Sequence, residues 1–169
     1  QGNFQKGMEL SNKSLEIHLK VFGEDHPAVA SCYQQLGNLF YDLGNTSQAL
    51  TNYMKSYEIR KKHFGELSTA IALSYNSLAI VHQKMNKYKE AFEYYNKCLN
   101  IHLALVGENH LDTSLAYLNL GLLQKSQSNY DKALEYLLKA YQIRSSILGE
   151  SHLATMTCKN KIGNLYEEL

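Results

Sequence analysis

The sequence predicts an all-α fold, an α-solenoid of antiparallel helix pairs with about eight helices. One observation is a strict period: the dipeptide Gly-Glu recurs every 42 residues, starting at residues 23, 65, 107 and 149. A second is a column of small residues with the same period, Gly7, Ala49, Ala91 and Ala133. A third is the single proline among 169 residues, which favours long unbroken helices. One repeat of this kind cannot bury its apolar face alone, so stacked repeats must complete the core.

The period divides into helices separated by short breaks. We expect a lone second helix over residues 3–22, then the pairs 27–43/46–64, 69–85/88–106 and 111–127/130–148, and a lone first helix over 152–168. The whole chain, 1–169, is then one array with complete repeats at 27–64, 69–106 and 111–148. Because it starts and stops within a repeat and lacks an initial methionine, we expect a fragment of a longer protein.

Each element has its own local signals. In the second period, Cys32, Leu36, Leu39 and Leu43 recur at the spacing of one helical face. The long helices end at glycines, which accept the left-handed conformation at a helix C-terminus. Residues just beyond these glycines are expected to cap the next helix at its N-terminus, namely Asp25, Ser68, Asn109 and Ser151.

Composition argues against several classes of partner. The formal net charge is +1, so no strong field attracts nucleic acid or an anionic membrane surface. No apolar run approaches the roughly 20 residues that cross a bilayer, and no signal peptide opens the chain. We therefore expect neither nucleic-acid binding nor membrane insertion, and a cytoplasmic protein. The cysteines are odd in number. All three, Cys32, Cys98 and Cys158, are expected to be buried and unpaired.

The histidines suggest structure rather than chemistry. His26, His110 and His152 share one column of the repeat, so they lie about one repeat apart and should cap or brace the turns between repeats. No histidine and cysteine cluster has zinc spacing, and no phosphate-binding glycine loop occurs. We expect no cofactor, no metal and no catalytic residue, and the protein is not expected to be an enzyme.

The repeat resembles the tetratricopeptide pattern, which reads here as Tyr33-x2-Leu36-Gly37-x2-Phe40 followed by Ala49 and Tyr53. Tetratricopeptide repeats usually have 34 residues, whereas these have 42. This longer form is similar to the repeats of kinesin light chains and nephrocystin-like proteins, on the segments 23–30, 75–79 and 86–91. The resemblance implies a right-handed superhelix that binds proteins in a concave groove, and a cytoskeletal or ciliary connection.

The face of each first helix that points away from the core should be polar, yet the middle helices carry large aliphatic residues there. By the resemblance this face lines the groove, and its amides would bond a bound peptide. The expected partner-binding residues are Gln34, Asn38, Tyr41, Leu73, Asn76, Ile80, Gln83, Leu115, Leu118, Leu122, Lys125 and Asn160. The alternative for the leucines is burial against the neighbouring second helix.

The expected function is a protein-interaction scaffold that binds a peptide or helix of a partner protein. Two alternatives stay open. One is a structural building block of a larger assembly, with end-to-end self-association through the half-repeat ends. The other is a regulatory tetratricopeptide domain of a larger multidomain protein.

Overall fold

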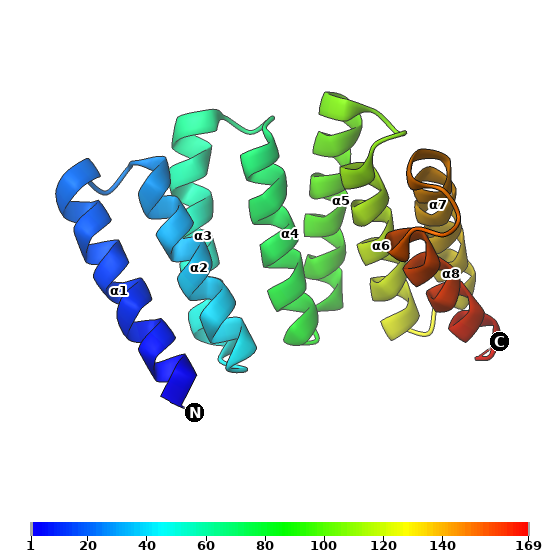
Figure 1. Ribbon diagram of the computed structural model, residues 1–169, viewed down its shortest axis with the longest axis horizontal. Coiled ribbons are helices and arrows are strands. Elements are labelled where there is room, and N and C mark those ends of the chain that lie inside the picture. The colour runs from blue at the N-terminus through cyan, green and yellow to red at the C-terminus, as the bar shows by residue number, and fades with distance from the viewer. Residues whose placement is uncertain (1, 169) are drawn as a thin grey trace. The chain divides into compact units, whose positions relative to one another are not determined.

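The computed structural model describes the backbone of residues 2–168 and the side chains of residues 5–168. This part of the chain contains helices and no strand, which confirms the all-α class (Figure 1). Each helix begins and ends within two residues of its expected bounds. The helices are α1 Gly2–Phe22, α2 Pro27–Asp42, α3 Thr46–Phe64, α4 Thr69–Lys84, α5 Tyr88–Val106, α6 Leu111–Ser126, α7 Tyr130–Leu148 and α8 Leu153–Tyr166.

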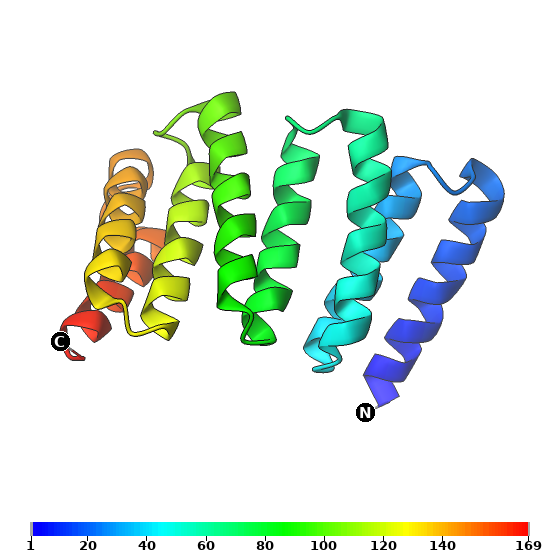
Figure 2. The ribbon, with the colours of Figure 1, turned by 180° about the vertical axis from the view of Figure 1, so that it is seen from behind.

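The helices form two compact units, unit 1 at Gln1–Lys87 and unit 2 at Tyr88–Leu169. In unit 1, α2 packs against both α1 and α3, and α3 also packs against α4. Figure 1 shows α2 in front of α3, and Figure 2 shows α3 in front when the molecule is seen from behind. In unit 2, α6 packs against α5 and α7, and α7 packs against α8. Each unit is therefore a stack of antiparallel neighbours joined by short turns, the solenoid arrangement that the period predicts.

Histidines cap three of the helices. Nδ1 of His26, His110 and His152 accepts a hydrogen bond, 3.2 Å long in each case, from the backbone N–H two residues on. This confirms that the histidine column caps the turns between repeats. The expected caps Asp25, Asn109 and Ser151 were wrong by one residue, whereas Ser68 caps α4 as expected. The error arose because aspartate, asparagine and serine are commoner N-caps than histidine.

Two columns of the repeat turn the chain at residues with a positive φ. Gly23, Gly65, Gly107 and Gly149 follow the long helices with φ between 71° and 83°. Gly44, Asn86 and Ser128 occupy the turn inside each pair, with φ of 76°, 59° and 58°. Residues with a Cβ adopt a positive φ rarely, apart from asparagine and aspartate. The same backbone conformation therefore recurs at each period although the residue type changes.

Small residues set the spacing within each pair. Ala49, Ala91 and Ala133 are fully buried. A Cβ added to Gly37 would lie 2.4 Å from Cε1 of the Tyr53 ring, and one added to Gly121 would lie 2.8 Å from Cγ of Leu137. This confirms that the two helices of a pair approach closely at these positions.

Two buried arginines bridge three helices each. Arg60 of α3 donates from Nη1 to Gln34 Oε1 of α2 at 3.2 Å and to Ser74 Oγ of α4 at 3.1 Å. Arg144 of α7 donates to Ser114 Oγ of α6 and to the carbonyl oxygen of Ala154 in α8, both at 3.1 Å. Burial lowers the pKa of Arg60. Because neutral groups accept these bonds, the arginines link consecutive helices without a buried ion pair.

His102 occupies the position equivalent to Arg60 and Arg144, 42 residues from each. Its Nδ1 is buried and has no hydrogen-bond partner among the described residues. Burial lowers the pKa of His102, while the carboxylate of Asp112 acts in the opposite direction and His110 acts in the same direction. The neutral imidazole is therefore the form that fits the interface between α5 and α6.

The three cysteines are buried and free, as expected. Burial raises the pKa of Cys98 to about 12, with a smaller contribution from Asp112. A thiol with so high a pKa holds very little thiolate at neutral pH and reacts slowly.

We predict that Gly37→Ala destabilises the protein. The new Cβ would overlap the ring of Tyr53, which is buried and whose hydroxyl donates to Asn38 at 2.9 Å, so the ring is held in place. The expected loss is about 1–3 kcal/mol of unfolding free energy, in spite of the roughly 1 kcal/mol by which alanine is the better helix former. Urea denaturation followed by circular dichroism measures it.

Gly163→Ala is the matched control, because it occupies the same column and its Cβ would have no neighbour within 4 Å. We expect this change to leave stability unaltered or to raise it by up to about 1 kcal/mol. Two substitutions of equal effect would contradict the role assigned to Gly37.

We predict a pH-dependent loss of stability that depends on His102. Its folded-state pKa is lowered below the ordinary value of about 6.5, so the protonated form favours the unfolded chain. The stability that the neutral ring contributes is present above about pH 6.5 and is lost as the pH falls through the lowered pKa. Unfolding free energies measured between pH 7.5 and 5.5 should fall less steeply in His102→Leu than in the wild type. Equal slopes would show that other groups cause the loss.

Candidate partner-binding surface

The structure brings six of the expected residues of unit 1 together around one cavity of about 490 Å³. They come from α2 and α4, the first helices of their pairs, and are Gln34, Asn38, Tyr41, Leu73, Asn76 and Ile80. Gln83, the other expected residue of unit 1, is half-buried on α4 and is not part of the cavity wall. The other residues that line the cavity, Asp42, Tyr53 and Ser77, were not expected from the sequence.

Gln34 differs from its expected role. Gln34 is 9% exposed. Its Nε2 donates to Ser77 Oγ at 2.9 Å and to Asn38 Oδ1 at 3.3 Å. Its Oε1 accepts from Arg60, as described above. Buried polar groups need such partners, and here they come from three other helix positions. Gln34 is therefore part of the cavity floor, held by neighbours, rather than an open amide.

Tyr53 reaches the cavity from α3. Its position follows Ala49 in a column that the sequence assigns to the core, and its ring is indeed 3% exposed. Its hydroxyl nevertheless donates to Asn38 Oδ1 at 2.9 Å. Burial raises the pKa of Tyr53 to about 12, and Tyr41 and Asp42 add to the increase. The phenol therefore stays protonated and orients Asn38, which no signal in the one-dimensional pattern could show.

Apolar side chains complete this wall. Leu73 is 48% exposed, and Ile80 is half-buried two turns further along α4. Asn76 lies between them and is half-buried. Tyr41 is also half-buried, with the ammonium of Lys84 6.0 Å from its ring centroid. The cavity thus combines an exposed leucine with amide groups and a tyrosine, as expected for this face of unit 1.

In unit 2 the leucines on the equivalent face of α6 are unequally exposed. Leu115 is 45% exposed and Leu122 is half-buried, but Leu118 is only 7% exposed. The expectation that Leu118 is open to a partner was wrong. The buried arc of α6 is wide, because α5 and α7 both pack against it. For Leu118 the alternative of burial within the fold is the correct one.

The two remaining expected residues of unit 2 differ in character. The Lys125 ammonium lies 2.8 Å from Glu168 Oε1, an ion pair that engages the lysine within the unit. Asn160 is exposed on α8. On the described surface of unit 2, Leu115 and Asn160 are therefore the expected residues most open to a partner.

A metal site and a membrane span each require particular groupings of the described residues. Among them, no group of three or more histidine, cysteine, aspartate or glutamate side chains could hold a metal ion. In the same part of the chain, no helix has the length and apolar character needed to cross a membrane. The arrangement of unit 1 can accept an apolar side chain beside Leu73 and offer hydrogen bonds from amides.

Comparison with known proteins finds a curated relative that matches a short segment of this chain, and solved structures of similar fold. A clustered mitochondria protein homolog of Xenopus tropicalis is 36% identical over 52 residues, which are 31% of this chain and 4% of that protein. The structure of BtubC (BKLC) from P. vanneervenii has a TM-score of 0.86 at 24% identity and covers 98% of this chain and 66% of that chain. This chain therefore spans less than two thirds of either.

Kinesin light chain-like structures have the same fold. A putative kinesin light chain from Podosopora anserina, with nearly identical TPR-like repeats, has a TM-score of 0.80 at 18% identity, covering 98% of this chain and 79% of that one. The tetratricopeptide repeat family model matches residues 1–62 and 68–146, most of the sequence. With its 42-residue helix pairs and these matches, the chain belongs to the tetratricopeptide repeat family, in the fold of kinesin light chain-like repeat proteins.

Proposed function

We propose that this chain binds a short peptide segment or helix of a partner protein at the cavity of unit 1. A protein-interaction scaffold is consistent with the tetratricopeptide fold. The observation that carries the proposal is the cavity itself, which has about 490 Å³ and places the exposed Leu73 beside Asn38 and Asn76. Ligand pockets typically have 300–1,000 Å³ and combine apolar walls with a few polar groups.

The chemistry of the cavity favours a partner with an apolar anchor. A leucine or aromatic side chain of the partner would contact Leu73 and Ile80, which are partly exposed in the free protein. Asn38 is held by Tyr53 and Gln34, so it can bond a partner without first being ordered. Such preorganisation lowers the entropic cost of binding and gives the bound segment a defined register.

Leu73→Glu tests this proposal. Peptides selected from a random displayed library on the immobilised wild-type chain should bind the variant at least 10-fold more weakly, because a carboxylate replaces the apolar contact. The matched control is Leu67→Glu, which changes a leucine that is 60% exposed in the turn before α4 and outside the cavity. Fluorescence anisotropy measures both dissociation constants.

Both changes are at exposed positions. The free energy of unfolding, measured by thermal denaturation, should therefore change by no more than about 0.5 kcal/mol in either variant. Selected peptides that bind Leu73→Glu as tightly as the wild type would refute the cavity as the binding site. A library that yields no binder would also count against it.

A second candidate function, a building block that stacks through its ends, is favoured by one comparison between repeats. Ile17 of α1 is 54% exposed, whereas Ile59, Ile101 and Ile143 at the equivalent positions are at most 8% exposed. Met156 of α8 is 47% exposed in a column that is otherwise fully buried. These two faces carry the side chains that pair helices elsewhere in the fold, so α8 of one copy could pair with α1 of the next.

Sedimentation velocity of this chain at rising concentration tests the stacking function. Head-to-tail contacts that do not close into a ring produce chains of increasing length rather than a single dimer. We expect Ile17→Asp to abolish the longer species and Leu67→Asp to leave them unchanged. A wild-type protein that remains monomeric at hundreds of micromolar would exclude this function for residues 1–169.

A further inference from the structure

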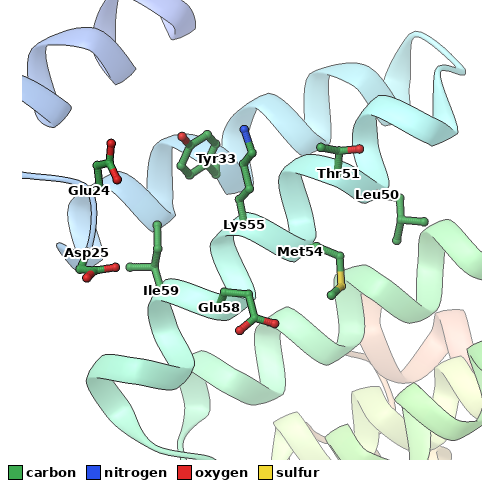
Figure 3. Close-up of a pocket in the computed structure, with 9 residues that line it drawn as sticks. All are labelled: Glu24, Asp25, Tyr33, Leu50, Thr51, Met54, Lys55, Glu58 and Ile59. Atoms are coloured by element: carbon green, nitrogen blue, oxygen red, sulfur yellow. The ribbon is translucent and has the colours of Figure 1, made fainter.

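A second and larger hollow lies in unit 1, on the α3 side (Figure 3). We call it the α3 cleft. It has a volume of about 810 Å³, and its walls come from the turn between α1 and α2, from α2 and from one face of α3. The residues that line it are Glu24, Asp25, Tyr33, Leu50, Thr51, Met54, Lys55, Glu58 and Ile59. Residues of α2 and α3 line both hollows, but no single residue lines both.

The floor of the α3 cleft is apolar and firmly packed. Ile59 is buried in a cluster with Val29 and Ala30, against which Tyr33 packs. Leu50 and Met54 are half-buried and continue this apolar strip along α3. From Leu50 to Ile59 the helix rises about 14 Å, the length of roughly two and a half helical turns. The floor can therefore hold several apolar side chains of a partner at once.

Carboxylates gather at one end of the α3 cleft. Figure 3 shows Glu24 and Asp25 at the end opposite Leu50, with Glu58 between them and Met54. Asp25 is paired with Lys62 at 2.9 Å, and Lys62 also interacts electrostatically with Glu58 and Glu24, which are exposed. Two exposed carboxylates at the edge of an apolar floor attract a cation that brings apolar groups with it.

Lys55 is the cation among the lining residues of the α3 cleft, and it contacts another lining residue. The ammonium of Lys55 lies 5.0 Å from the centroid of the Tyr33 ring, within the range of a cation–π contact. The carboxylates of Glu24, Asp25 and Glu58 outnumber the nearby ammonium groups of Lys55 and Lys62. The cleft therefore has a local negative charge although the chain as a whole carries a formal charge of +1.

Unit 2 has the same lysine–tyrosine framework with fewer carboxylates. Lys139 lies over the ring of Tyr117 at 5.4 Å, as Lys55 does over Tyr33. The positions 84 residues beyond Asp25 and Glu58 are Asn109 and Gln142, which are neutral. Glu24 has an acidic equivalent in unit 2, Glu108, so the acids that distinguish the α3 cleft from its unit 2 counterpart are Asp25 and Glu58.

We propose that the α3 cleft docks a short amphipathic helix of a partner protein that has a leucine- or methionine-rich stripe and arginines or lysines at one end. The apolar stripe would lie on Leu50, Met54 and Ile59. The cations would meet the carboxylates of Glu24, Asp25 and Glu58. A helix fits better than an extended strand, because the backbone groups of α3 are bonded within the helix and offer no edge for a strand to pair with. Methionine in the floor suits this role, since its flexible side chain adapts to different apolar partners.

Two synthetic 12-residue helical peptides with one leucine stripe test the proposal, one with arginines and the other with glutamates in its last turn. Their binding to the full chain is measured by fluorescence anisotropy at low salt and at physiological salt. We expect the arginine peptide to bind at least 10-fold more tightly, with an advantage that shrinks as salt screens the carboxylates. Equal affinity of the two peptides would overturn the proposal.

Two variants locate the bound peptide. Met54→Lys places a charge in the floor and should weaken binding of the arginine peptide at least 10-fold. Leu138→Lys, the equivalent change in unit 2, should leave this binding unchanged. Asp25→Asn with Glu58→Gln installs the residues of unit 2 and should weaken it about 5-fold, without disturbing the apolar floor. Because both acids are exposed, this double variant stays informative if Met54→Lys proves unstable.

A further pair of changes separates docking from general charge attraction. Glu93→Gln with Asp131→Asn alters the net charge by the same amount at exposed positions outside the cleft. This control should leave the affinity within 2-fold of the wild type, and Leu73→Glu should do the same. A control that weakens the peptide as much as the cleft variants would refute a site at α3.

Discussion

The close approach of two helices at small residues is the constraint on which the rest of the structure depends. A Cβ at Gly37 would overlap the ring of Tyr53, so the pair α2/α3 can pack at its observed separation only while that position lacks a side chain. Ala49, a small residue on the other helix of the pair, is fully buried. This spacing lets Tyr53 reach between the helices and hold Asn38, so a packing requirement also shapes the proposed binding cavity.

The link between one pair and the next is polar as well as apolar. Arg60 and Arg144 each bond a helix of their own pair and the first helix of the following one. Since all the acceptors are neutral, geometry and not charge pairing selects these contacts. His102 stands in the same column, and burial lowers its pKa. The contact between consecutive helices therefore accepts a change of residue type at this column, with arginine at two positions and histidine at the one between them.

The two hollows of unit 1 differ in chemistry because different residues of α2 and α3 line them, together with α4 in one and the turn before α2 in the other. The cavity at α2 and α4 presents amides, a tyrosine and Leu73, which suit a neutral peptide with an apolar anchor. The α3 cleft presents an apolar floor with carboxylates at its end, which suit a basic amphipathic helix. Because the two share no lining residue, variants in each can separate the proposed functions, and occupation of one does not require the other to be empty.

The sequence by itself determined the period, the helix bounds and the columns of small and apolar residues, because these are set by local propensity and by spacing along one helix. It also placed six residues of the cavity correctly on one face. Only the tertiary structure decided which of the expected residues are accessible. Gln34 and Leu118 lie on that face yet are buried, since exposure depends on how far neighbouring helices close over a helix. The carboxylates of the α3 cleft, 33 residues apart in Asp25 and Glu58, become neighbours only when the turn and α3 pack together.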